Sequence, residues 1–79
     1  MTRMDTHKLV KMANEIAQFF EAEPEEKARL DGIAGHLRRF WDPRMRRALL
    51  DWFETGGEGL RPSVLQALKA HRAALAPTG

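Results

Sequence analysis

Proline and glycine divide this 79-residue sequence into short segments, and within each segment apolar residues recur at the spacing of an α-helix. The breaks lie at Pro24, at Asp42-Pro43 and within 56–62, where Gly56-Gly57-Glu58-Gly59 precedes Arg61-Pro62. Proline suits the first turn of a helix, and three glycines in four positions disfavour any helix or strand. No run alternates apolar and polar residues as a strand would. The pattern predicts an all-α protein, a small three- or four-helix bundle.

A single domain is expected over 1–79, with an ordered core at about 6–75 and a frayed tail at 76–79. Helices are predicted at about 6–21, 24–41, 43–53 and 62–75, with Asp42 as the cap of the third. The residues expected on their inner faces are Leu9, Met12, Ala13, Ile16, Phe19 and Phe20, then Leu30, Ile33, Ala34, Leu37, Phe40 and Trp41, then Met45, Leu49, Trp52 and Phe53, and finally Val64, Leu68, His71 and Leu75. Leu50 points away from the third of these stripes and is expected to be exposed.

The second segment carries Gly32 and Gly35 behind its apolar stripe. Each glycine in a helix costs about 1 kcal/mol relative to alanine. Either Gly32 breaks the segment into two short helices, or the small residues form a groove that another backbone approaches closely. The sequence is compatible with both the break and the groove.

The small size and the composition favour a chain that binds a partner. A domain of this length buries only roughly 60–65% of its unfolded surface, and such domains are commonly reinforced by disulfides, metals or association. Cysteine is absent, which excludes disulfides, thiolate metal sites and iron–sulfur ligation. No segment reads as a signal peptide or membrane span, so a soluble protein is expected.

No catalytic, cofactor-binding or metal site is predicted from the residues. The three histidines, His7, His36 and His71, stand in separate segments without the spacing of a metal pair or a triad. Ser63 fits the first turn of a helix better than it fits a nucleophile, and a partly buried, hydrogen-bonded His71 is expected. The glycine stretch lacks the Lys-Ser/Thr of a phosphate-binding loop. The chain is therefore not expected to be an enzyme by itself.

Basic residues concentrate around the second break. Residues 1–35 carry five Lys/Arg and seven Asp/Glu, whereas residues 36–79 carry eight and four. The candidate partner-binding residues are Arg38, Arg39, Trp41, Arg44, Arg46, Arg47 and Leu50. The arginines would form forked hydrogen bonds to carboxylates or carbonyls, with Trp41, Leu50 or Trp52 as apolar contacts.

Three other interpretations of the same stretch stay open. A small helical DNA-binding regulator would use the Arg38–Arg47 cluster on phosphates, although the modest net charge of +2 speaks against it. In the second alternative the cluster is a solvated face in which Arg47 pairs with Asp51, and the tryptophans are ordinary core residues. In the third alternative the isolated chain associates with other copies of itself.

Four stretches of this sequence resemble the delta subunit of NAD-dependent, molybdenum-containing formate dehydrogenases. They are Met12-Ala13-Asn14-Glu15-Ile16-Ala17, His36-Leu37-Arg38-Arg39-Phe40-Trp41-Asp42-Pro43-Arg44-Met45-Arg46, Gly56-Gly57-Glu58-Gly59-Leu60 and Pro62-Ser63-Val64-Leu65. The resemblance covers roughly residues 9–69, and Arg61 departs from it where an acidic or polar residue is expected.

The resemblance implies a cytoplasmic bacterial complex that oxidises formate and passes the electrons to NAD. Its larger subunits would hold the molybdenum cofactor, the iron–sulfur clusters and the flavin, and the delta chain would hold none. The implied partners of this chain are those catalytic subunits. The implied role is a non-catalytic accessory subunit that docks onto them and supports stability, maturation or activity.

Overall fold

The computed structural model describes residues 5–77, which form five helices and no strand. The helices are α1 (Thr6–Phe20), α2 (Glu26–Phe40), α3 (Pro43–Glu54), α4 (Pro62–Ala70) and α5 (Arg72–Leu75). The predicted fold class, a small all-α bundle, is confirmed. Thr78 and Gly79 of the expected frayed tail lie outside the described residues.

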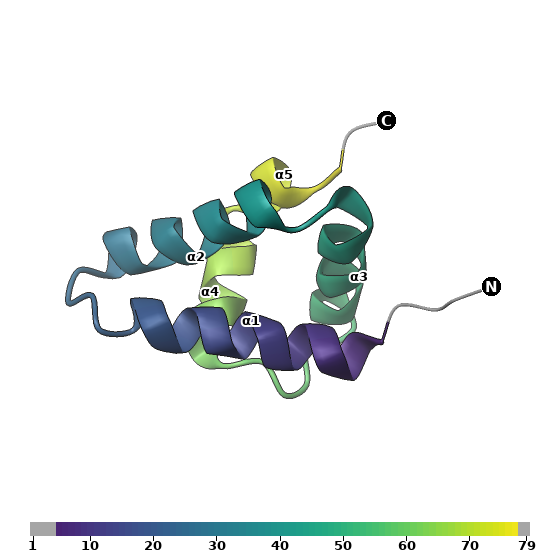
Figure 1. The fold of residues 1–79 in the computed structure, drawn as a ribbon, viewed down its shortest axis with the longest axis horizontal. Coiled ribbons are helices and arrows are strands. Elements are labelled where there is room, and N and C mark those ends of the chain that lie inside the picture. Colours follow the sequence, from purple (N-terminus) through teal and green to yellow (C-terminus); the bar gives the residue numbers. More distant parts are fainter. Residues whose placement is uncertain (1–4, 78–79) are drawn as a thin grey trace.

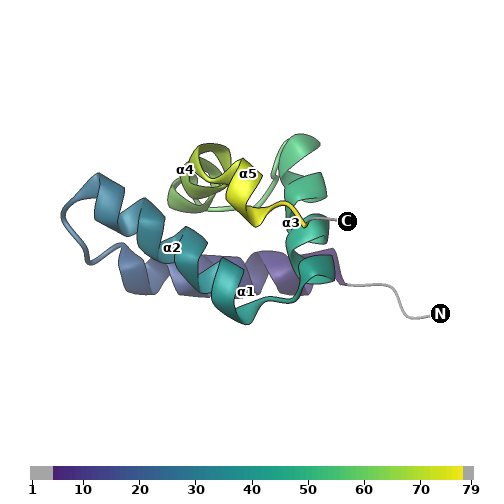
Figure 2. The ribbon, with the colours of Figure 1, turned by 90° about the horizontal axis from the view of Figure 1, so that it is seen from above.

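The chain is arranged as an antiparallel helix pair with further helices against one side and one end. α1 and α2 run alongside each other, and α3 stands across one end of the pair (Figure 1). α4 and α5 lie together against one side of this pair (Figure 2). No helix within residues 5–77 is long and apolar enough to cross a membrane.

The core lies where α1, α2, α3 and α4 meet. All of its members are less than a tenth exposed: Leu9, Ala13, Ala17, Ile33, Ala34, Leu37, Trp41, Leu49, Leu50, Leu60, Val64, Ala67, Leu68 and Leu75. Most of these residues come from the predicted stripes. Alanines line the core side of α1 and α4, so the helices can approach closely there.

The breaks at Asp42-Pro43 and at residues 56–62 act as predicted. The Asp42 carboxylate accepts a hydrogen bond from the Met45 N–H at 3.0 Å and caps α3, with Pro43 as the first helical residue. The loop at 56–59 turns through glycines, of which Gly57 has a φ of +64°. The Trp52 indole N–H donates to the Glu58 carbonyl at 2.8 Å and holds this loop against the end of α3.

Two helix boundaries differ from the prediction. α2 begins at Glu26 rather than at Pro24, so Pro24 lies in the connection before the helix. The predicted last helix is interrupted at His71, which separates α4 from α5.

Gly32 does not break α2, which is continuous over all fifteen of its residues. A Cβ atom at Gly32 would lie 2.4 Å from Cδ1 of Phe20, so the glycine makes room for an aromatic ring from α1. The close approach predicted as the alternative therefore exists, but a side chain makes it rather than a backbone. At Gly35 a Cβ would meet no atom within 4 Å.

Candidate functional site

Five arginines gather at the corner where α2 ends and α3 begins. We call Arg38, Arg39, Arg44, Arg46 and Arg47 the arginine corner. Two come from the last turn of α2 and three from the first turns of α3. The short connection between them is fixed by the buried Trp41 and the cap at Asp42. The corner is therefore a defined surface rather than a flexible basic segment.

The guanidinium groups of the arginine corner make no hydrogen bond or ion pair with any side chain or carbonyl in residues 5–77. Arginines elsewhere in this range behave differently. Arg29 donates to the Glu23 carbonyl at 2.8 Å, Arg61 pairs with Glu21, and Arg72 pairs with Glu54. The pair between Arg47 and Asp51, which belonged to the alternative of a solvated face, does not form. The corner thus keeps its donors available.

Arg46 differs from the other members of the corner because it is half-buried. Its Nε atom is buried without a hydrogen-bond partner in the described part of the chain. A buried donor left without an acceptor costs about 1–3 kcal/mol. An acceptor supplied from outside would remove that cost.

Two of the apolar residues predicted to bind a partner are buried. Leu50 was expected to be exposed, and this prediction is wrong: it is only 6% exposed. The reason is that α3 packs against α1, α4 and α5, so its apolar surface is wider than the single stripe assumed. Trp41 is 5% exposed, which confirms the alternative of core packing. Trp52 is half-buried against the core and holds the glycine loop.

Two phenylalanines predicted to face the core are instead exposed. Phe19 is 75% exposed and Phe40 is 70% exposed. Adjacent residues on a helix point about 100° apart, so Phe20 can sit against Gly32 only if Phe19 turns away. Likewise Trp41 enters the core while Phe40 stays outside. These rings are the exposed apolar residues that the sequence pattern misplaced.

A polar cluster ties α1 to the start of α4. The Glu21 carboxylate accepts hydrogen bonds from Arg61 Nε at 2.8 Å, from Arg61 Nη2 at 2.7 Å and from the Ser63 hydroxyl at 2.7 Å. The bonds from Arg61, and after them the one from Ser63, lower the pKa of Glu21 from its ordinary value of 4.5 to about 2. Asn14 adds two bonds: it accepts from the Arg61 N–H and donates to the Gly59 carbonyl, both at 2.9 Å.

The sequence prediction missed this cluster because its partners are 40 to 47 residues apart. In the sequence, Arg61 stood out only as a departure from the family pattern, at a position where an acidic or polar residue is expected. Its side chain gives α4 no cap and is directed instead to Glu21. Ser63 is confirmed as a residue of the helix start, and its hydroxyl is occupied by Glu21.

His71 is partly buried and hydrogen-bonded, as predicted. Its Nε2 lies 2.8 Å from Oδ1 of Asp31, whose other oxygen accepts from the Lys27 ammonium at 2.8 Å. The hydrogen bond from Lys27 is the main cause that lowers the pKa of Asp31, and His71 acts in the same direction. The contacts of Lys27, Asp31 and His71 join α2 to the junction between α4 and α5, and we interpret them as structural.

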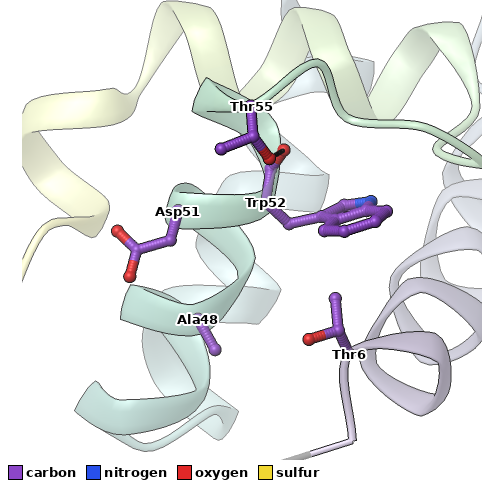
Figure 3. Close-up of a pocket in the computed structure, with 5 residues that line it drawn as sticks. All are labelled: Thr6, Ala48, Asp51, Trp52 and Thr55. Atoms are coloured by element: carbon purple, nitrogen blue, oxygen red, sulfur yellow. Dashed lines mark hydrogen bonds between the residues drawn. The ribbon is translucent and has the colours of Figure 1, made fainter.

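A shallow hollow of about 300 Å³ lies between α3 and the start of α1. Thr6, Ala48, Asp51, Trp52 and Thr55 line it, and the Asp51 carboxylate is directed away from Thr6 and Trp52 (Figure 3). The Thr55 hydroxyl donates to the Trp52 carbonyl, so it is used within the helix end. Within residues 5–77 no group of three His, Asp or Glu could hold a metal ion. The arginine corner is therefore the best candidate for a functional surface.

A family model described as NADH-dependant formate dehydrogenase delta subunit FdsD matches residues 8–68, which is more than half of the chain. No curated protein and no solved structure matches the chain. The matched residues extend from α1 to α4 and include the whole arginine corner.

Proposed function

Because the chain belongs to the FdsD family of NADH-dependent formate dehydrogenase delta subunits, we propose that it docks through its arginine corner onto a larger subunit of that enzyme. In this proposal it is a non-catalytic, cytoplasmic accessory subunit. It holds no cofactor, and it supports the stability, maturation or activity of the assembly.

The observation that carries the proposal is the contrast among the arginines. Arg29, Arg61 and Arg72 all have partners within the chain, whereas the five members of the corner have none in the part of the chain that the structure describes. Guanidinium groups form forked, charge-assisted hydrogen bonds with carboxylates, and arginine is enriched among the residues that dominate binding energies. A rigid corner with free guanidinium groups suits docking.

The buried Nε of Arg46 is a second observation that supports docking through the arginine corner. A carboxylate or carbonyl of a partner that reached it would satisfy a donor that has no acceptor among residues 5–77. Solvated surface arginines gain little from single ion pairs, so the half-buried position of Arg46 makes it the best anchor of the corner.

The proposal is tested by co-purification. The tagged full-length chain is mixed with a formate dehydrogenase that lacks its delta subunit, and the retained catalytic subunits are quantified. The test variant is Arg38→Ala/Arg44→Ala/Arg47→Ala, and the control is Lys8→Ala/Lys11→Ala/Lys69→Ala, which removes the same charge from exposed positions elsewhere. We expect the wild type and the control to retain the enzyme and the test variant to lose most of it.

Activity and thermal inactivation of the enzyme, with and without the chain, then separate a role in catalysis from one in stability. Maturation is read from the cofactor content of enzyme produced in cells with and without the chain. Failure of the wild-type chain to retain any catalytic subunit would overturn the proposal. A salt-dependent shift of duplex DNA that the arginine variant abolishes would favour the DNA-binding alternative instead.

A further inference from the structure

Four aromatic side chains form a continuous row along the α1–α2 pair. The rings of Phe19 and Phe20 are 5.1 Å apart, and those of His36 and Phe40 are 4.8 Å apart. Phe20 and His36 join the two halves, because both line the same two hollows. We call Phe19, Phe20, His36 and Phe40 the aromatic row. Its two outer members are the large apolar residues that the structure leaves most exposed.

The hollows along this row have volumes of about 230 Å³ and 180 Å³ and are lined only by α1 and α2. No residue of α3, α4 or α5 lines either of them. Gly35 contributes open space to the second hollow, since a Cβ there would meet nothing within 4 Å. A groove between two helices with exposed aromatic rings and a small residue in its floor accommodates a third helix.

The charge beside the groove specifies what that helix carries. Arg39, a member of the arginine corner, lines the same hollow as Phe20 and Phe40. Asp31 also lines it, but its carboxylate is already bonded to Lys27 and His71. The aromatic row therefore adjoins Arg39, whose guanidinium group has no partner within residues 5–77. An incoming helix matches this surface if one of its faces is apolar and carboxylates stand at the end that lies over Arg39.

We propose that the aromatic row binds an amphipathic, acidic helix of the catalytic partner. The apolar side of that helix contacts Phe19 and Phe40, and its carboxylates pair with Arg39. This inference rests on the proposed function and names the partner chemistry of the same surface. A second copy of the chain fits less well. Four side chains cover far less than the roughly 800 Å² per partner that a stable interface needs. A stable complex therefore needs further contacts beside the row, and the adjoining arginine corner is available to supply them.

The first test compares affinities for the formate dehydrogenase that lacks its delta subunit. The test variant is Phe19→Ser/Phe40→Ser, and Gln18→Ser, which is also exposed on α1, is the control. We expect the double variant to bind at least about tenfold more weakly and the control to bind unchanged. Both rings are exposed, so circular dichroism should show that each variant folds like the wild type.

The second test identifies the occupant. Phe19 or Phe40 is replaced by the photo-reactive p-benzoylphenylalanine, the complex is assembled and irradiated, and the cross-linked peptide is sequenced. We expect a helical segment of a catalytic subunit that carries Asp or Glu. Cross-links to a second delta chain, or to a segment without acidic residues, would overturn the inference.

The two proposals fail in different ways. If the wild-type chain retains no catalytic subunit, the proposed function fails. If it retains the enzyme and the Phe19→Ser/Phe40→Ser variant binds equally well, only the role of the aromatic row is refuted.

Discussion

The two glycines of α2 make a matched pair of perturbations, because replacement by alanine should stabilise the fold at Gly35 but not at Gly32. At Gly32 a Cβ would lie 2.4 Å from Cδ1 and 2.5 Å from Cε1 of Phe20. At Gly35 it would meet no atom within 4 Å. Both residues lie inside the helix, so the gain in helix propensity on replacement by alanine is the same.

The magnitudes follow from these contacts. Gly35→Ala should raise the free energy of unfolding by about 0.5–1 kcal/mol, since alanine loses less backbone entropy on folding. Gly32→Ala makes the same gain, but overpacking against the Phe20 ring costs about 1–3 kcal/mol. The net effect of Gly32→Ala should therefore range from nearly neutral to destabilising by about 2.5 kcal/mol.

The assay is thermal and urea denaturation of the full-length chain, followed by circular dichroism. For a domain of this size, 1 kcal/mol shifts the Tm by about 4–8 °C, so the two variants should be resolved from each other. In a Phe20→Ala background the ring is gone, and Gly32→Ala should then stabilise as Gly35→Ala does. Equal stabilisation by both alanines with Phe20 in place would refute the packing of Phe20 on Gly32.

Three further predictions concern other parts of the chain. The pKa of Glu21 is lowered to about 2, so its bonds stabilise the fold above pH 4.5, and this stabilisation is lost as the pH falls from 4.5 toward 2. Over that pH range, the free energy of unfolding should fall less for Glu21→Gln than for the wild type. Asp42→Ala should cost about 1 kcal/mol in urea denaturation, because it removes the cap of α3. Leu50→Ala should cost about 2–5 kcal/mol, whereas Phe40→Ala should stay within about 0.5 kcal/mol of the wild type; similar values for both would contradict the burial described here.

Local signals in the sequence sufficed for the helices and their breaks. Asp42-Pro43 both ends α2 and caps α3, and the glycines at 56–59 can turn only as a loop. These features depend on residues next to each other in the chain. The same locality explains why the position of the arginine corner on either side of this break was predictable.

Features set by distant contacts were not predictable. Leu50 lies off the main stripe of its own helix, and only the number of helices around α3 explains its burial. The choice between Phe19 and Phe20 depends on where Gly32 lies on α2. The bonds between Glu21 and Arg61 join residues 40 apart. No periodicity within a single helix carries this information.

The most direct test of the central claim is a cryo-electron microscopy structure of the assembled formate dehydrogenase with this chain bound. We predict that the arginine corner faces a larger subunit, with guanidinium nitrogens at about 2.7–3.2 Å from its carboxylate or carbonyl oxygens. A complex in which the chain is bound through another surface, with Arg38, Arg39, Arg44, Arg46 and Arg47 all facing solvent, would contradict the account.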